Sequence, residues 1–142
     1  MNRLFFSVLL VGVASGCSSG VTVDPDVLTG TYRATQFTIE RSGQPTVNVL
    51  AVGGSVQLEL KVGLTTAGRL VIPVAAGIAT TAIDDDLIGQ YQVIGPSVIR
   101  YQSLNPGVFI DSYLFTSDPP ELRAFLSLQQ PAGQISLVLR KQ

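Results

Sequence analysis

Apolar and polar residues alternate with a period of two in several short segments, and this alternation constrains the fold more than any other feature. Val56, Leu58 and Leu60 alternate with polar or charged neighbours, and residues 122–128 and 135–140 follow the same pattern. Successive side chains of a β-strand point to opposite faces, so such segments bury one face and expose the other to solvent. The apolar spacing of an amphipathic helix is not sustained anywhere after Leu28. The sequence therefore predicts an all-β domain.

Turn-forming residues divide this domain into eight expected strands. The separators contain Gly, Pro or Asn, as in Gly53-Gly54 and Asn105-Pro106-Gly107. Short strands joined by tight turns favour an antiparallel barrel or sandwich, and a closed barrel leaves no free edge. We therefore expect a small antiparallel up-and-down barrel of about eight strands over residues 28–142. The expected strands are Thr31–Glu40, Ser55–Val62, Arg69–Ile72, Gly89–Ile94, Val98–Gln102, Phe109–Thr116, Leu122–Leu128 and Gln134–Lys141.

Two apolar stretches do not fit the strand pattern. Residues Val47–Val52 lack alternation and are expected to form a short helical turn that caps one barrel end. Residues Val74–Ile83 are rich in Ala, Gly and Thr and are expected to form the longest loop. Because loops usually lie in water, an apolar loop suggests one of three roles. It would fold over a cavity mouth, contact a partner, or pack onto the barrel.

Residues 1–16 have the features of a cleavable export signal. A short start with Asn2 and Arg3 precedes ten mostly apolar residues, and the small residues Ala14, Ser15 and Gly16 follow. A membrane-spanning helix needs about 20 apolar residues, so this run is too short to be one. The pattern predicts a signal peptide that is removed from the mature protein.

The stretch Val13-Ala14-Ser15-Gly16-Cys17 resembles the lipobox of bacterial lipoproteins, with Ala14 where leucine is preferred. The resemblance implies lipidation of the Cys17 sulfur and cleavage after Gly16. The alternative is an ordinary secretory signal with an incidental cysteine. Cys17 is the only cysteine, so no intrachain disulfide can form. Residues 17–27 are then expected to be a lipidated tether, and the membrane a partner of the chain through the lipid.

Ser18 follows the cysteine at the position where an aspartate often marks inner-membrane lipoproteins. A serine instead of an aspartate at this position resembles lipoproteins of the outer membrane. The expected location is therefore the cell envelope, with the domain anchored to the outer membrane and facing the periplasm or the exterior.

One motif, Leu-x-Gly-x-Tyr, occurs twice. Its copies are Leu28-Thr29-Gly30-Thr31-Tyr32 and Leu87-Ile88-Gly89-Gln90-Tyr91, and each opens one half of the domain. Glycine lets backbones approach closely where a strand enters a barrel. Tyrosine fills the barrel end with a ring whose hydroxyl can stay hydrated or hydrogen-bonded.

The segment Gly30-Thr31-Tyr32 resembles the Gly-x-Trp motif that opens lipocalin barrels, with Tyr in place of Trp. Arg140 is the candidate for the basic residue that packs on this ring in that family. Together with residues 51–55, 68–73 and 86–89, the motif resembles small bacterial lipocalin-like lipoproteins over nearly all of residues 28–142. The resemblance implies a barrel that holds a small apolar ligand.

Eight aromatic residues are the candidates for lining such a ligand pocket. The same residues would equally serve as a packed core, because an eight-stranded barrel is just wide enough for either use. They are Tyr32, Phe37, Tyr91, Tyr101, Phe109, Tyr113, Phe115 and Phe125.

The residue inventory argues against catalysis, and neither a catalytic residue nor a cofactor nor a metal is expected. The chain has no histidine, which excludes Ser-His-Asp and Cys-His catalysis and the usual zinc and haem sites. Asp84-Asp85-Asp86 could suit a hard cation, but adjacent carboxylates cannot all face one ion, so a solvated turn is favoured. A carboxylate enzyme would need two acids about 5–10 Å apart. The scattered candidates are Glu40, Glu59, Asp111 and Glu121.

The net charge is −1 and no basic patch stands out in the sequence, which argues against nucleic-acid binding. The sequence thus favours a non-enzymatic, lipid-anchored barrel that binds a small apolar ligand. The alternative is a protein-interaction module, such as an envelope inhibitor or an assembly subunit. That module would use its loops, with residues Val74–Ile83 the first candidate.

Overall fold

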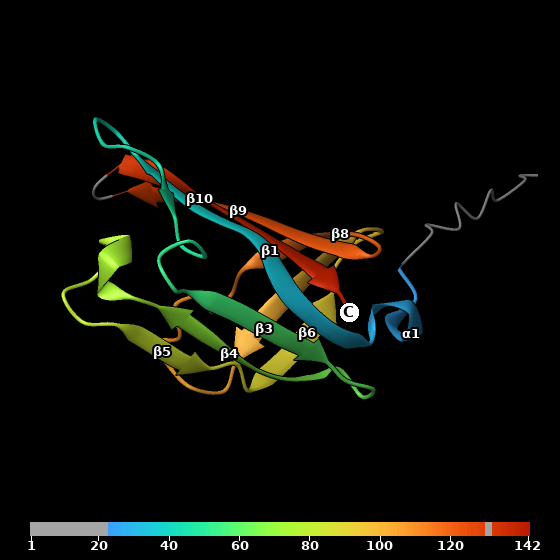
Figure 1. The fold of residues 1–142 in the computed structure, drawn as a ribbon. Helices are drawn as coiled ribbons and strands as arrows, with labels where there is room; N and C mark the ends of the chain where they lie inside the picture. The colour runs from blue at the N-terminus through green and yellow to red at the C-terminus, as the bar shows by residue number, and fades with distance from the viewer. Residues whose placement is uncertain (1–22, 130–131) are drawn as a thin grey trace, which may run out of the picture.

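Eight antiparallel strands close into a barrel in the computed structural model, which describes residues 23–129 and 132–142 (Figure 1). Neighbours in the barrel follow the order of the sequence, and the last strand pairs with the first. The expected all-β, up-and-down barrel is confirmed, and this architecture is compatible with a lipocalin-like fold. The barrel strands are β1 (Gly30–Arg41), β3 (Ser55–Leu60), β4 (Thr65–Ile72), β6 (Gly89–Val93), β7 (Val98–Ser103), β8 (Leu114–Asp118), β9 (Glu121–Gln129) and β10 (Ala132–Lys141).

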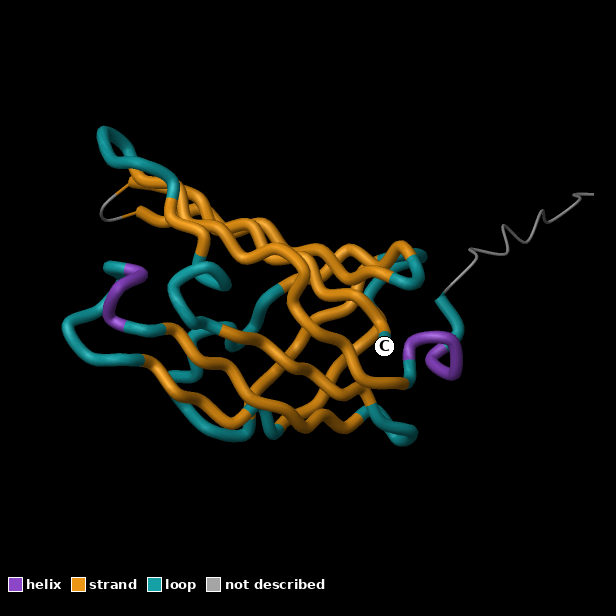
Figure 2. Tube along the Cα trace, viewed as in Figure 1, coloured by secondary structure: helices purple, strands orange, loops and turns teal. Residues whose placement is uncertain are grey.

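Two short strands and two short helices complete the described part of the chain. Strand β2 (Val47–Asn48) pairs with β1, and β5 (Ile83–Asp86) pairs with β4. The four-residue helix α1 (Pro25–Leu28) lies at the barrel end that holds the C-terminus, and the 3₁₀ helix η1 (Val74–Ala76) lies at the other end (Figure 2). Within the described residues, no helix is long and apolar enough to cross a bilayer.

Alternation along the strands places the core inside the barrel. On β3, Val56, Leu58 and Leu60 are buried, whereas Ser55 and Gln57 are exposed. Strand β10 buries Ile135, Leu137 and Leu139 in the same way, but it also buries Val138. Val138 lies beside a register shift in β1 between Ala34 and Gln36, which interrupts the regular pairing of β1 with β10. The inward side chains form one contiguous apolar core.

The expected strand over Phe109–Thr116 is wrong in its first half. Strand β8 begins only at Leu114, and residues 104–113 are irregular. Side chains supply hydrogen-bond acceptors in place of a regular strand partner there. Asp111 Oδ1 accepts from the Ser103 amide at 2.8 Å, and Asp85 Oδ2 accepts from the Phe109 amide at 3.0 Å.

The helical turn expected over Val47–Val52 is also wrong, because this segment begins as β2 and continues as a series of turns. Asn48 is the cause, since its side-chain oxygen accepts from the backbone amides of Leu50 and Ala51 and favours a turn. The Val49 amide donates to the Phe37 carbonyl, and the Val49 side chain is buried in the core. The segment therefore packs over the barrel without forming a helix.

Residues Val74–Ile83 pack onto the barrel, which was one of the three roles expected for them. Ala76 is buried, and Ile78 packs against the core. Arg41 donates to the Ala76 carbonyl at 3.1 Å and joins this segment to β1. The segment contains η1 and ends in β5, so it is more ordered than the expected loop.

The two Leu-x-Gly-x-Tyr motifs have the structural roles that their residue types predict. Leu28 and Leu87 are buried, and so are the rings of Tyr32 and Tyr91. A Cβ added to Gly89 would lie 2.1 Å from the Gln102 carbonyl oxygen, so this position admits only glycine.

The hydroxyls of these two tyrosines satisfy backbone carbonyls at the barrel end near α1. Tyr32 Oη donates to the Leu28 carbonyl at 2.8 Å, and Tyr91 Oη donates to the Lys61 carbonyl at 3.4 Å. Both copies of the motif therefore contribute to closing the same end of the barrel.

The expectation that Arg140 packs on the Tyr32 ring is wrong. Arg140 is opposite Arg33 and exposed on the outer face, whereas Tyr32 points inward. Lys141 is the residue opposite Tyr32, and its Nζ donates to the Val27 carbonyl at 3.0 Å. Arg140 and Lys141 are adjacent on β10, and adjacent residues on a strand face opposite sides of the sheet.

Candidate functional site

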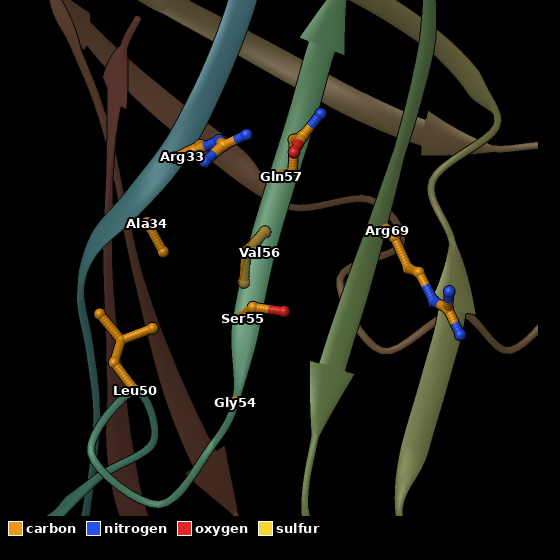
Figure 3. A pocket seen from close by; sticks show the side chains of 8 residues that line it. All are labelled: Arg33, Ala34, Leu50, Gly54, Ser55, Val56, Gln57 and Arg69. Carbon is orange, nitrogen blue, oxygen red and sulfur yellow. The ribbon is translucent and has the colours of Figure 1, made fainter.

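A cavity opens in the barrel wall where β1 separates from β3. The two strands pair only between residues 30–33 and 57–60, and the later part of β1 pairs with β2. The register shift between Ala34 and Gln36 lies at the point of separation. We call the resulting space of about 480 Å³ the seam cavity (Figure 3). Its lining residues are Arg33, Ala34, Leu50, Gly54, Ser55, Val56, Gln57 and Arg69.

The seam cavity combines apolar and polar lining residues. Ala34, Leu50 and Val56 supply apolar surface, and Leu50 lies between β1 and β3 (Figure 3). Ser55 and Gln57 are exposed and bring a hydroxyl and a carboxamide. Small-molecule sites typically have this mixture of apolar walls and a few polar groups, at volumes of about 300–1,000 Å³.

Arg33 and Arg69 lie on either side of Gln57, but they differ in direction and in charge balance. The Arg33 side chain extends from β1 toward β3, whereas that of Arg69 points away from β3 (Figure 3). Arg69 is held by Asp84 through two hydrogen bonds, Nε to Oδ1 at 2.7 Å and Nη2 to Oδ2 at 2.6 Å. The hydrogen bond from Arg69 lowers the pKa of Asp84. Asp84 therefore neutralises Arg69.

Arginines also face each other across β1 and β10, beside the cavity. Arg33 is opposite Arg140 on β10 and opposite Gln57 on β3, and Gln57 is in turn opposite Arg69. Neither Arg33 nor Arg140 has a salt bridge within residues 23–129 and 132–142. The outer face of the barrel thus carries Arg33 at the edge of the seam cavity and Arg140 opposite it on β10.

The eight candidate aromatic residues do not gather around a single cavity. Five are almost fully buried in the core, namely Tyr32, Phe37, Tyr91, Tyr101 and Phe115. Tyr113 is nearly buried, Phe109 is half-buried beside it, and Phe125 on β9 is 60% exposed on the outer face. Tyr113 and Phe125 line a smaller cavity of about 300 Å³, together with Asp111, Ser112, Leu114, Leu126 and Ser127. None of the eight lines the seam cavity.

Burial raises the pKa of four of these aromatic residues above the ordinary tyrosine value. Desolvation is the leading cause for Tyr32, Tyr91, Tyr101 and Tyr113. The upward shift reflects the low-dielectric surroundings of these hydroxyls, so the side chains behave as core residues with a polar tip.

Most acidic residues singled out in the sequence make local contacts. Glu59 pairs with Lys61, which directly follows β3, and Glu121 pairs with Arg123, while Asp111 accepts from the Ser103 amide. Glu40 is exposed near one end of β1, opposite Gln134. Within the described ranges, no group of three or more acidic, histidine or cysteine side chains is arranged to hold a metal ion.

The seam cavity was not predictable from the sequence, although Gly54, Ser55 and Arg69 belong to the stretches 51–55 and 68–73 that resemble lipocalin-like lipoproteins. Its formation depends on which residues of β1, β3 and β4 lie opposite one another, and an isolated sequence does not reveal that register. Cys17, the predicted lipidation site, lies outside the described residues.

Comparisons of the chain with protein-family models, with curated proteins and with solved structures find no match. The site is therefore interpreted from its own geometry.

Proposed function

We propose that this chain is a lipid-anchored cell-envelope protein whose barrel binds a small, largely apolar molecule without catalysing a reaction. The observation that carries the binding role is the seam cavity, whose volume and apolar walls suit such a ligand. Support for a non-enzymatic role comes from the absence of histidine and from the local partners of Glu59, Asp111 and Glu121.

The proposed anchor is a lipid on Cys17, and the proposed location is the outer membrane. It is supported by the lipobox-like residues Val13–Cys17 and by the short apolar run that precedes them. The test is mass spectrometry of the chain purified from bacterial envelopes. A mature chain that starts at Cys17 and carries added acyl mass supports the anchor, whereas an unmodified chain that still starts at Met1 contradicts it.

The binding role is tested by titrating the purified protein with straight-chain alcohols and fatty acids of increasing length. Saturable binding that strengthens with each added methylene supports the proposal, because burial of one methylene contributes about 0.8 kcal/mol. The substitution Ala34→Phe adds a large side chain to the seam cavity, and it is expected to weaken binding. Absence of binding by every compound would contradict the proposed function.

The exposed surface of β9 favours a second candidate function, that of a protein-interaction module. Strand β8 pairs with β9 only along residues 121–123, so the described part of β9 beyond Arg123 has no partner from β8. Residues 124–129 carry no charge, and both Phe125 and Leu114 are exposed large apolar residues. Uncharged strand edges can add a strand from another protein.

A photo-crosslinking residue at position 125 tests this second candidate in intact envelopes. A discrete crosslinked partner that position 125 captures and position 90 does not would support the module. Gln90 is a suitable control because it is exposed on β6 and is paired with both β4 and β7. Identical crosslinking patterns at the two positions would count against it.

A further inference from the structure

The two arginines beside the seam cavity are not balanced by neighbouring acids. Arg33 and Arg140 lie directly opposite each other on β1 and β10, and both are exposed on the same face. Like charges in this position destabilise a sheet. Glu121 is opposite Arg140 on β9, but its carboxylate is bound by Arg123. Arg33 therefore has a cationic residue opposite it on β10 and no acidic partner among the described residues.

The seam cavity brings a cationic side chain and apolar surface together, and this combination limits the chemical class of ligand that fits it. Arg33 lines the seam cavity itself, and its side chain extends toward Gln57 at the cavity rim (Figure 3). The apolar residue Ala34 follows Arg33 on β1, and Leu50 lies between β1 and β3 (Figure 3). A ligand that occupies the cavity would thus place one end beside a guanidinium and its body against apolar surface.

Arg69 lies in the same cross-strand row as Arg33 and Gln57, and its surroundings can be compared with those of Arg33. Its guanidinium donates two hydrogen bonds to Asp84, and its side chain points away from β3 (Figure 3). Arg33 has neither feature, since within the described residues no carboxylate lies within ion-pair distance of it. The net charge of the chain is −1, so this local excess of cations does not reflect a generally basic protein.

We propose that the seam cavity binds an amphiphile with an anionic head group, a phosphate or a carboxylate, which Arg33 holds and which the nearby charge of Arg140 attracts. This inference rests on the proposed binding function and adds the place and the head-group chemistry. Guanidinium groups suit both anions because their donors match two oxygens at once. The tail would contact Ala34 and Leu50, which pack against the core from the barrel wall, and the outer edge of the buried Val56.

The experiment uses the full lipidated chain in nanodiscs of zwitterionic lipid, with empty nanodiscs as the blank. Octyl phosphate, 1-octanol and inorganic phosphate are titrated separately by calorimetry. Octyl phosphate is expected to bind about tenfold or more tightly than 1-octanol, since a hydrogen bond to a charged group is a strong contact. Inorganic phosphate, which lacks a tail, is expected to bind most weakly.

Substitutions assign the effect to the arginines. Arg33→Gln is expected to reduce the affinity for octyl phosphate to that for 1-octanol, and Arg140→Gln is expected to reduce it less. Arg100→Gln is the matched control, because Arg100 is exposed on β7 and does not line the seam cavity. Unchanged thermal unfolding of each variant shows that the fold is intact.

The outcomes separate this inference from the proposed function. Equal binding of octyl phosphate and 1-octanol, unaffected by Arg33→Gln, overturns the anionic head group and leaves the binding function standing. Binding of inorganic phosphate as tightly as octyl phosphate also overturns the inference, because the tail would then contribute nothing. Failure of both octyl compounds to bind contradicts the proposed function itself.

A second set of nanodiscs, containing phosphatidylglycerol, distinguishes the two sources of such a head group. Weaker octyl phosphate binding in these discs supports the anion site and identifies a bilayer lipid as a competing occupant. Unchanged binding supports a free amphiphile as the occupant, provided that the Arg33→Gln effect persists.

Discussion

Individual glycines in this barrel differ in how much room a side chain would have. A Cβ on Gly89 would lie 2.1 Å from the Gln102 carbonyl oxygen, which belongs to the neighbouring strand β7. A Cβ on Gly95 would lie 3.9 Å from its nearest neighbour, an ordinary contact distance. Sequence alone identifies both as glycines, but only the paired strand shows that one of them is irreplaceable.

We expect Gly89→Ala to reduce the free energy of unfolding by about 2 kcal/mol or more, because the backbones of β6 and β7 must move apart. Gly95→Ala is the matched control and should change stability by less than about 0.5 kcal/mol. Urea unfolding followed by circular dichroism measures both. Equal effects of the two substitutions would show that the close approach at Gly89 does not matter.

The hydroxyls of the repeated motif allow a second prediction at the scale of single residues. Tyr32 Oη makes a buried 2.8 Å hydrogen bond to the Leu28 carbonyl, and the bond from Tyr91 Oη to Lys61 is longer, at 3.4 Å. Tyr32→Phe should therefore cost about 1–2 kcal/mol of stability, and Tyr91→Phe about 0.5 kcal/mol. Thermal unfolding measures the difference, and a larger loss for Tyr91→Phe would contradict the assignment.

Among the structural elements, regular strands were predicted well and irregular segments were not. The strict alternation in β3 revealed its buried face, because period two is a direct consequence of strand geometry. The segment before Leu114 has apolar residues and looks like a strand, but carboxylates fix it in another conformation. The two carboxylates belong to Asp85 and Asp111. The backbone amides that they bind are determined by the tertiary fold, which the local sequence does not show.

We expect Asp111→Ala to loosen residues 104–113 without unfolding the barrel. The substitution removes the acceptor of the Ser103 amide, a loss of about 1 kcal/mol, so that amide should exchange faster with solvent. Asp118→Ala is the control, because Asp118 is exposed on β8. Amide hydrogen exchange followed by NMR tests the prediction. Unchanged Ser103 exchange would show that another contact fixes this segment.

The candidate site illustrates what the sequence could not supply. The eight aromatic residues were identified as core or pocket, and five of them are almost fully buried. The seam cavity depends on the separation of β1 from β3 and on the pairing of Arg33 with Arg140. Both features follow from strand register, which hydrophobic pattern alone does not fix for residues on the outer face.

At the scale of the whole molecule, the titratable groups inside the barrel set the pH dependence of stability. The chain has no histidine, so no side chain of the barrel has an ordinary pKa between about 6 and about 9. Burial raises the pKa of Tyr32, Tyr91, Tyr101 and Tyr113, so the folded barrel retains protons that the unfolded chain releases. The stability linked to these tyrosines is fully present below the ordinary tyrosine pKa and is lost as the pH rises from that value through the raised pKa values of the folded barrel.

We therefore expect the free energy of unfolding to be nearly constant from about pH 6 to about pH 9 and to fall above about pH 10. Urea midpoints measured across this range test the prediction. Tyr113→Phe should make the alkaline decrease shallower, because the buried Tyr113 phenol contributes to it. A decrease that begins below about pH 8 would require a different titrating group.

The central claim for the molecule is that its barrel interior is packed and that its ligand binds in the outer wall. Amide chemical shifts of the ¹⁵N-labelled protein, recorded during titration with octyl phosphate, test this claim most directly. The claim predicts saturable shifts at Arg33, Ala34 and residues 54–57, with little change at Tyr91, Tyr101 and Phe115. Shifts concentrated at those interior residues, with Arg33 and residues 54–57 unaffected, would contradict it.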